Sequence, residues 1–169
     1  MRAIRPVLLA AATVSVLSAT AVATAARGPA QDGTLSVRDG RGTLILRLKG
    51  GVIGRFARGK LTVTDPGGND GTIVVRGEER QREVNERTTV YSGRNIRFRI
   101  ADEQRFGVKI EASKINLSAV GRGEGWIDGR GDPDEGVYFD GSWSLNGADY
   151  RSLPDVREHF DLEAPPSAD

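Results

Sequence analysis

The sequence predicts an all-β domain, either an antiparallel sandwich or a flattened barrel of about ten short strands. Apolar and polar residues alternate with a period of two along most of the chain, and no long window has a helical period. Glycine is frequent, with 22 residues, and divides the alternating stretches at intervals of roughly 8–12 residues. A β-solenoid is the alternative architecture.

The N-terminus, residues 1–26, is predicted to be a signal peptide. Two arginines supply the positive start, an apolar run covers residues 7–22, and an Ala-Thr-Ala triplet ends at Ala25. We expect cleavage after Ala25 or Ala26, which gives a secreted or extracytoplasmic mature protein. The alternative is an uncleaved anchor, because residues 7–26 form a stretch of 20 residues that is just long enough to span a bilayer.

Composition excludes several classes of function. The chain has no cysteine, which removes disulfides, thiolate metal sites and thiol nucleophiles. It carries 24 Lys plus Arg against 23 Asp plus Glu, so it lacks the basic surplus of a non-specific polyanion binder. We therefore expect no nucleic-acid partner, and a membrane partner only if the leader is uncleaved.

The predicted β domain covers residues 33–153. In its clearest strands every second residue is apolar, and Gly, Asp-Gly or Asn-Gly signals mark the ends. Each such strand is expected to bury one face. Strands are expected over residues 34–38, 44–49, 52–57, 60–64, 72–76, 88–92, 95–100, 105–110, 115–120, 124–128, 136–140 and 143–146.

Two segments suggest an internal duplication. Residues 42–77 and 106–141 are each 36 residues long and align without a gap at an offset of 64, so that Leu46 matches Ile110. A true duplication predicts two five-stranded halves around one core, with Ile73 inside it. The alternative is an accident of alternation, because any two stretches of alternating strands agree in apolar pattern.

Two other segments lack the strand pattern. Residues 77–85 mix both signs of charge and are predicted to form a solvated loop or a protruding hairpin arm, with a short helix as the lesser alternative. Residues 154–169 are predicted to be a C-terminal tail. There Asp155 caps one or two helical turns, and disorder is expected after residue 163.

One stretch also suggests a family. Residues 114–123, together with Thr89-Val90-Tyr91 and Arg97-Phe98-Arg99, combine a strand, a glycine-rich bend and another strand. In these residues the chain resembles a group of small exported β-rich proteins of unknown function from high-GC Gram-positive bacteria. The resemblance covers most of residues 33–153. It implies export and a β fold, and it carries over no site.

No catalytic residue is predicted. His159 is the only imidazole and lies in the tail, which argues against a Ser-His-Asp site and against zinc. A carboxylate pair, Asp134 or Glu135 with Asp140, would suit a glycan-directed hydrolase if the two groups lay about 5–10 Å apart. This hydrolase is the alternative function.

Calcium is the metal for which the sequence offers candidate ligands. Asp128, Asp132 and Asp134 offer hard oxygen ligands on a glycine-rich loop. Their spacing matches no established calcium motif, and the turn propensity of Asp and Gly explains the loop without a metal. No metal and no cofactor are therefore expected.

Three aromatic residues, Trp126, Tyr138 and Trp143, form the candidate binding platform. If Ile127 and Phe139 are buried, alternation turns Trp126 and Tyr138 outward. The alternative is that these aromatics close the open end of a sandwich. The sequence thus favours an exported, non-enzymatic binding or structural module, whose expected partner is an envelope glycan or protein.

Overall fold

The structure is a computed structural model that describes residues 31–65, 71–130 and 140–164. In these residues it contains six strands and no helix, and every strand belongs to one antiparallel sheet. The predicted all-β, antiparallel class is confirmed. The strands are β1 (Gln31–Thr64), β2 (Thr72–Asn85), β3 (Thr88–Gly129), β4 (Ser142–Leu145), β5 (Arg151–Ser152) and β6 (Glu158–Ala164).

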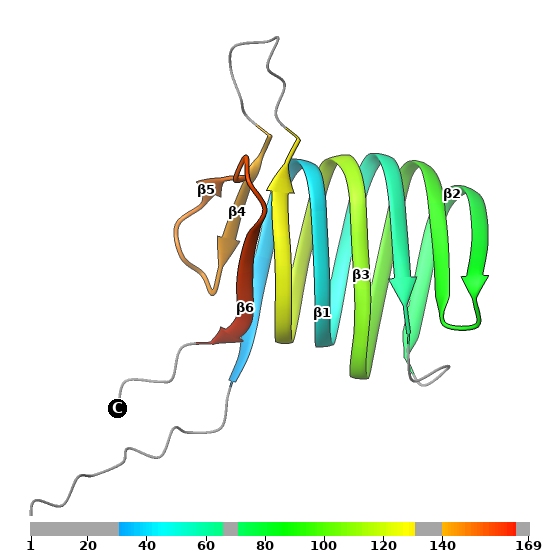
Figure 1. Cartoon of the computed structure of the whole chain (residues 1–169), viewed down its shortest axis with the longest axis horizontal. Coiled ribbons are helices and arrows are strands. Elements are labelled where there is room, and N and C mark those ends of the chain that lie inside the picture. The colour runs from blue at the N-terminus through cyan, green and yellow to red at the C-terminus, as the bar shows by residue number, and fades with distance from the viewer. Residues whose placement is uncertain (1–30, 66–70, 131–139, 165–169) are drawn as a thin grey trace, which may run out of the picture.

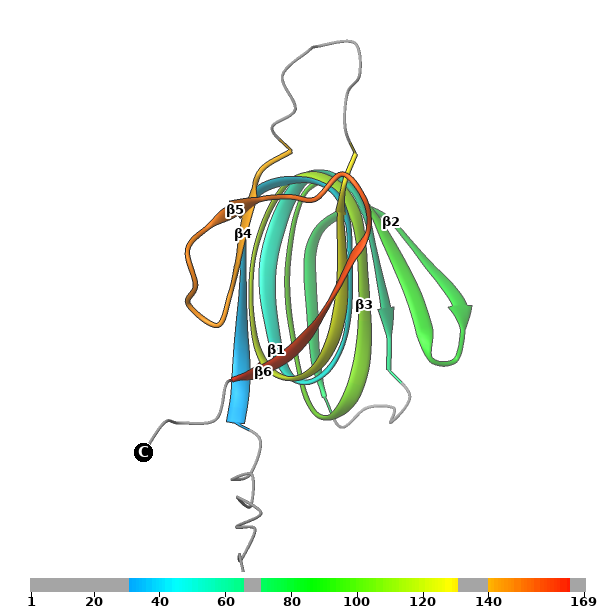
Figure 2. The ribbon, with the colours of Figure 1, turned by 60° about the vertical axis from the view of Figure 1, so that its left-hand side comes forward.

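Two long strands, β1 and β3, make most of the sheet by winding around each other. Leu44 of β1 pairs with Ile110 on one flank and with Ile127, 17 residues later, on the other. This double pairing recurs along β1, so a segment of β3 lies on each side of it. The strands therefore form a coil whose turns stand side by side (Figure 1) and curl around a common interior (Figure 2).

The finer predictions of architecture are not confirmed. The described residues form six strands in one curled sheet, in place of about ten short strands in a sandwich or in two five-stranded halves. The coil also differs from a parallel β-solenoid, because all of its strand pairings are antiparallel. The short strands were predicted because glycines were interpreted as strand ends.

Those glycines in fact bend strands that continue. Gly50 pairs with Gly121, and both have a positive φ, 139° and 151°. A Cβ atom on Gly50 would lie 2.2 Å from the carbonyl oxygen of Val120 on the neighbouring strand segment. Only glycine allows this φ and this close approach together, so the chain turns sharply without leaving the sheet.

The core fills the interior of the coil, and it follows the predicted alternation. Along much of β1 and β3 every second residue is buried, and β4 and β6 cover one end with Trp143 and Leu162, both with 0% of their surface exposed. Ile73 is different, since it keeps 39% exposed because β2 is an edge strand. The inward-facing residues that were predicted and are buried include Leu44, Leu46, Leu48, Ile96, Phe98, Ile100, Phe106, Val108 and Ile110.

Both segments without a predicted strand pattern contain a strand in the described residues. Residues 77–85 belong to β2 and pair with the start of β3, and all their side chains are exposed, so the protruding hairpin arm is confirmed (Figure 2). The helical turns expected after Asp155 are wrong. Residues 158–164 form β6, because Phe160 and Leu162 alternate inward against β3. No helix in the described chain is long and apolar enough to cross a membrane.

Candidate functional site

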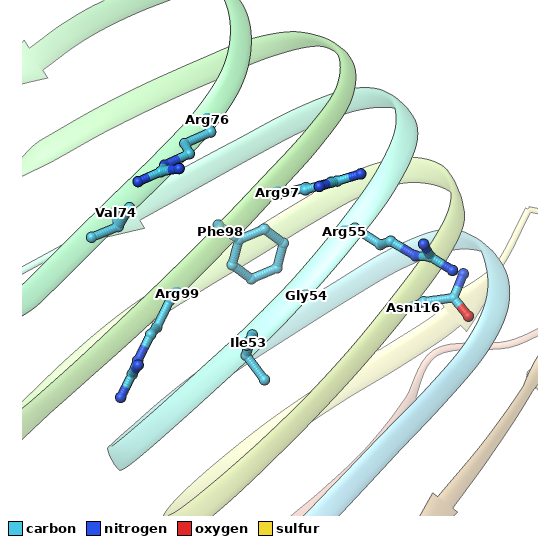
Figure 3. A pocket seen from close by; sticks show the side chains of 9 residues that line it. All are labelled: Ile53, Gly54, Arg55, Val74, Arg76, Arg97, Phe98, Arg99 and Asn116. Carbon is cyan, nitrogen blue, oxygen red and sulfur yellow. The ribbon is translucent and has the colours of Figure 1, made fainter.

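The register of the coil gathers arginines on its outer face, at the end formed by β2. Arg76 of β2 lies opposite Arg97 of β3, and Arg97 lies opposite Arg55 of β1. The row ends at Asn116, the other partner of Arg55. Three guanidinium groups on three adjacent strand segments therefore face the same side of the sheet (Figure 3).

A second row lies beside the first and adds apolar surface. Val74 of β2 is opposite Arg99 of β3, which is opposite Ile53 of β1. Ile53 keeps 58% of its surface exposed and Val74 keeps 40%. Together the two rows border an open groove of about 430 Å³, which we call the arginine groove. It is lined by Ile53, Gly54, Arg55, Val74, Arg76, Arg97, Phe98, Arg99 and Asn116.

The floor of the arginine groove is set by a glycine and a phenylalanine. Gly54 and Phe98 are cross-strand partners. A Cβ atom on residue 54 would lie 2.6 Å from Cζ of Phe98, so the absence of a side chain at Gly54 makes room for the aromatic ring. The ring itself is buried, at 3% exposed. The floor is thus apolar and fixed by packing, whereas the arginines along the rim are free to reorient.

The arginine groove has no internal counter-charge. Among the described residues, Arg55, Arg76, Arg97 and Arg99 form no ion pair and no side-chain hydrogen bond. The nearest carboxylate contact is at the end of the row, where Asn116 donates a hydrogen bond to Asp39. Like charges directly opposite each other on neighbouring strands are destabilising, so these rows have an electrostatic cost.

The surrounding strand segments are mostly free of acidic residues, and Asp39 beside Asn116 is an exception. Residues 50–64, 72–76, 93–101 and 113–118 contain eight Lys or Arg and no Asp or Glu. A surface on which one sign of charge predominates attracts ions of the opposite sign and raises their local concentration. The chemistry of the arginine groove therefore suits a ligand that carries anionic groups.

The predicted aromatic platform is not assembled in the described residues. Ile127 is fully buried, which turns Trp126 outward as predicted. The Trp126 ring, however, is half-buried, with its centroid 5.1 Å from that of His159 and 5.2 Å from the Arg47 guanidinium carbon. The prediction that Trp143 belongs to the platform is corrected, because its complete burial beside Phe160 leaves no surface for a ligand. Tyr138 lies outside the described residues.

The residues predicted for a calcium site or a hydrolase site form no such site in the described part of the chain. Asp128 is paired with Arg157, with 2.7 Å between Oδ2 and Nε, while Asp132 and Asp134 lie outside the described residues. Asp140 is buried, and its expected partners in a hydrolase, Asp134 and Glu135, also lie outside. In the part of the chain that is described, no three His, Asp or Glu side chains gather as metal ligands do.

The arginine groove was not predicted from the sequence, although a signal for it was present. A net charge near zero predicts no polyanion partner, but net charge does not report how charges are distributed over the surface. The acid-free stretch over residues 50–64 and the Arg97-Phe98-Arg99 alternation were both visible. The distance between them in the chain hid their juxtaposition, because Arg55 and Arg97 meet only through the register of the coil.

No protein-family model, curated protein or solved structure matches this chain. The resemblance to small exported β-rich proteins and the signal peptide therefore stay predictions.

Proposed function

We propose that this protein is an exported, non-enzymatic binding module of the cell envelope or extracellular space, and that it binds an acidic partner through the arginine groove. The observation that carries the proposal is the row Arg76, Arg97 and Arg55. Three exposed arginines stand directly opposite one another across strand segments, without a carboxylate partner in the described residues.

The energetics support a ligand in this position. Opposed like charges cost about 0.2–1 kcal/mol per pair, and no contact in the described chain offsets this cost. Departures from local rules of this kind concentrate at functional sites. A bound anion would supply the missing counter-charge. Guanidinium groups suit carboxylates and phosphates best, since they donate two parallel hydrogen bonds to such groups.

The predicted export supports the choice of partner. The leader would deliver the mature chain outside the cytoplasm, so the acidic partner is expected in the envelope or the extracellular space. A first check is the N-terminus of the exported chain, expected at Ala26 or Arg27. Recovery of the intact chain from the membrane fraction would contradict this part of the proposal.

The binding experiment uses soluble anionic polymers as probes. Affinity for polyphosphate and for a polyuronate is measured by calorimetry on the exported chain, its Arg55→Gln/Arg97→Gln variant and a matched control. The control, Lys49→Gln/Arg105→Gln, removes the same charge beside Glu124, Asp161 and Glu163. We expect both polymers to bind, the groove variant to bind at least about tenfold more weakly, and the control to bind like the wild type.

Two outcomes would overturn the proposed function. One is that neither polymer binds at low salt, which would contradict the proposal that the groove binds an acidic partner. The other is an equal loss of affinity in both variants, which would make net charge, and not the arginine groove, responsible. The hydrolase alternative depends on residues outside the described chain, and no observation favours it.

A further inference from the structure

The arginine groove combines cations with exposed aliphatic side chains, and this combination narrows the chemistry of its partner. We infer that the groove docks onto a membrane surface that carries anionic phospholipid, with the guanidinium groups on lipid phosphates and Ile53 and Val74 between the headgroups. This inference rests on the proposed function and names its partner, and it departs from the expectation that a membrane partner requires an uncleaved leader.

The exposed aliphatic residues favour a lipid surface over a soluble polyanion as the partner. Ile53 and Val74 lie in one cross-strand row on either side of Arg99, and they are 58% and 40% exposed. Val120, 47% exposed, pairs with Gly51, two residues before Ile53. A hydrated polymer would leave these side chains in water. A headgroup layer places anions directly above hydrocarbon, so that it satisfies both kinds of side chain.

The distribution of charge gives the docked protein an orientation. The arginine groove lies at the β2 end of the coil, while β6 lies at the other end (Figure 1). Residues 155–163, which lead into and form most of β6, contain four Asp or Glu and one Arg. An anionic membrane attracts the arginine groove and repels the acidic segment 155–163, so β6 is expected to face away from the lipid.

The binding of the protein to an anionic membrane is expected to be reversible. Each Lys or Arg near an anionic membrane surface strengthens binding about fivefold. The four arginines of the groove together then give an enhancement of several hundredfold over a neutral surface. The two aliphatic side chains add a smaller, salt-independent part. The protein should therefore associate peripherally with the membrane and dissociate when salt is raised.

The experiment measures partition onto vesicles by flotation. The chain purified after export is mixed with vesicles of phosphatidylcholine alone or of phosphatidylcholine with phosphatidylglycerol. We expect binding only to the second kind. Arg55→Gln/Arg97→Gln should lower the partition about 25-fold. Ile53→Ser/Val74→Ser should lower it about tenfold without changing the affinity for polyphosphate, while Lys49→Gln/Arg105→Gln should change neither by more than about twofold.

The outcomes separate this inference from the proposed function. If polyphosphate binds through the arginines but anionic vesicles do not bind, or bind equally well after the Ile53 and Val74 substitutions, the lipid inference is overturned and the proposed function stands. If neither polyphosphate nor vesicles bind, both are overturned. Equal binding to neutral vesicles also overturns the lipid inference. The unfolding midpoint of each variant shows that it is folded, which is expected because all the substituted side chains are exposed.

Discussion

Arg97 lies directly opposite Arg55 on the outer face of the coil, and neither guanidinium group has a counter-charge among the described residues. Arg58 and Arg94 also lie opposite each other further along the same two strands, where Glu79 and Glu111 line the same surface pocket. A fold selected only for stability would be expected to place an acidic or neutral residue in one position of each pair. The opposed arginines are therefore the feature from which the function is inferred.

Replacing one arginine of the row should not weaken the fold. Arg97→Gln removes two unfavourable cross-strand pairs, so the free energy of unfolding should stay the same or rise by about 0.2–1 kcal/mol. The matched control is Arg122→Gln, which breaks the 2.9 Å ion pair with Asp32 and should lower stability by up to about 1 kcal/mol. Urea unfolding measures both. A loss above about 1 kcal/mol for Arg97→Gln would mean that the arginine row stabilises the fold.

The bends of the coil predict a sharp contrast between two adjacent glycines. Gly50→Ala places a methyl group 2.2 Å from a backbone oxygen at a φ of 139°, so it should lower the free energy of unfolding by at least about 2 kcal/mol. At Gly51 the nearest atom to a new methyl group is 3.8 Å away, and Gly51→Ala should change stability by less than about 1 kcal/mol. Similar losses of stability for both variants would show that strand propensity, and not the bend, determines the cost of replacing these glycines.

Alanine substitution of the two tryptophans should lower the free energy of unfolding, measured with urea, by different amounts. Trp143→Ala empties the closed end of the core and should cost about 3–5 kcal/mol. Trp126→Ala removes a half-buried ring from the outer face and should cost about 1 kcal/mol. Because the indole N–H of Trp143 has no hydrogen-bond partner in the described residues, Trp143→Phe should be the mildest change at that position. Equal costs for the two alanine variants would contradict these placements.

The hairpin arm predicts a response to alkaline pH. Burial raises the pKa of Tyr91 above its ordinary 10.0, and the nearby Glu78 and Glu83 raise it further. The folded state therefore holds the phenol proton more tightly than the unfolded chain. This contribution to stability is complete below pH 10.0 and is lost as pH rises through the folded pKa. Tyr91→Phe should lose less stability than the wild type across that range, as followed by thermal unfolding, and parallel curves would disprove the assignment.

Local patterns predicted the faces of the strands but not their lengths. Alternation placed Leu46, Phe98 and Ile110 in the core, because side-chain direction in a strand depends only on neighbouring residues. Glycine has two roles that a single sequence does not separate, since it either ends a strand or bends one that continues. Gly50 and Gly121 bend strands, so two long strands were predicted as many short ones.

The binding surface was less predictable than the fold. Arg55 and Arg97 become neighbours only after β1 and β3 adopt their register, and that register is fixed by contacts between residues far apart in the chain. The aromatic platform was inferred from alternation within single strands, which gave the outward direction of Trp126. Alternation did not reveal that His159 of β6 would pack against the same ring, because β6 was predicted to be helical.

The most direct test of the arginine groove as the binding surface is a nuclear magnetic resonance titration with polyphosphate that follows the side-chain Nε–H signals of the arginines. We predict that the signals of Arg55, Arg76, Arg97 and Arg99 move together and saturate at one affinity. The signals of Arg122 and Arg157, which are paired with Asp32 and Asp128, should stay in place. Shifts spread equally over all arginines, or centred on Arg47 beside Trp126, would contradict the account.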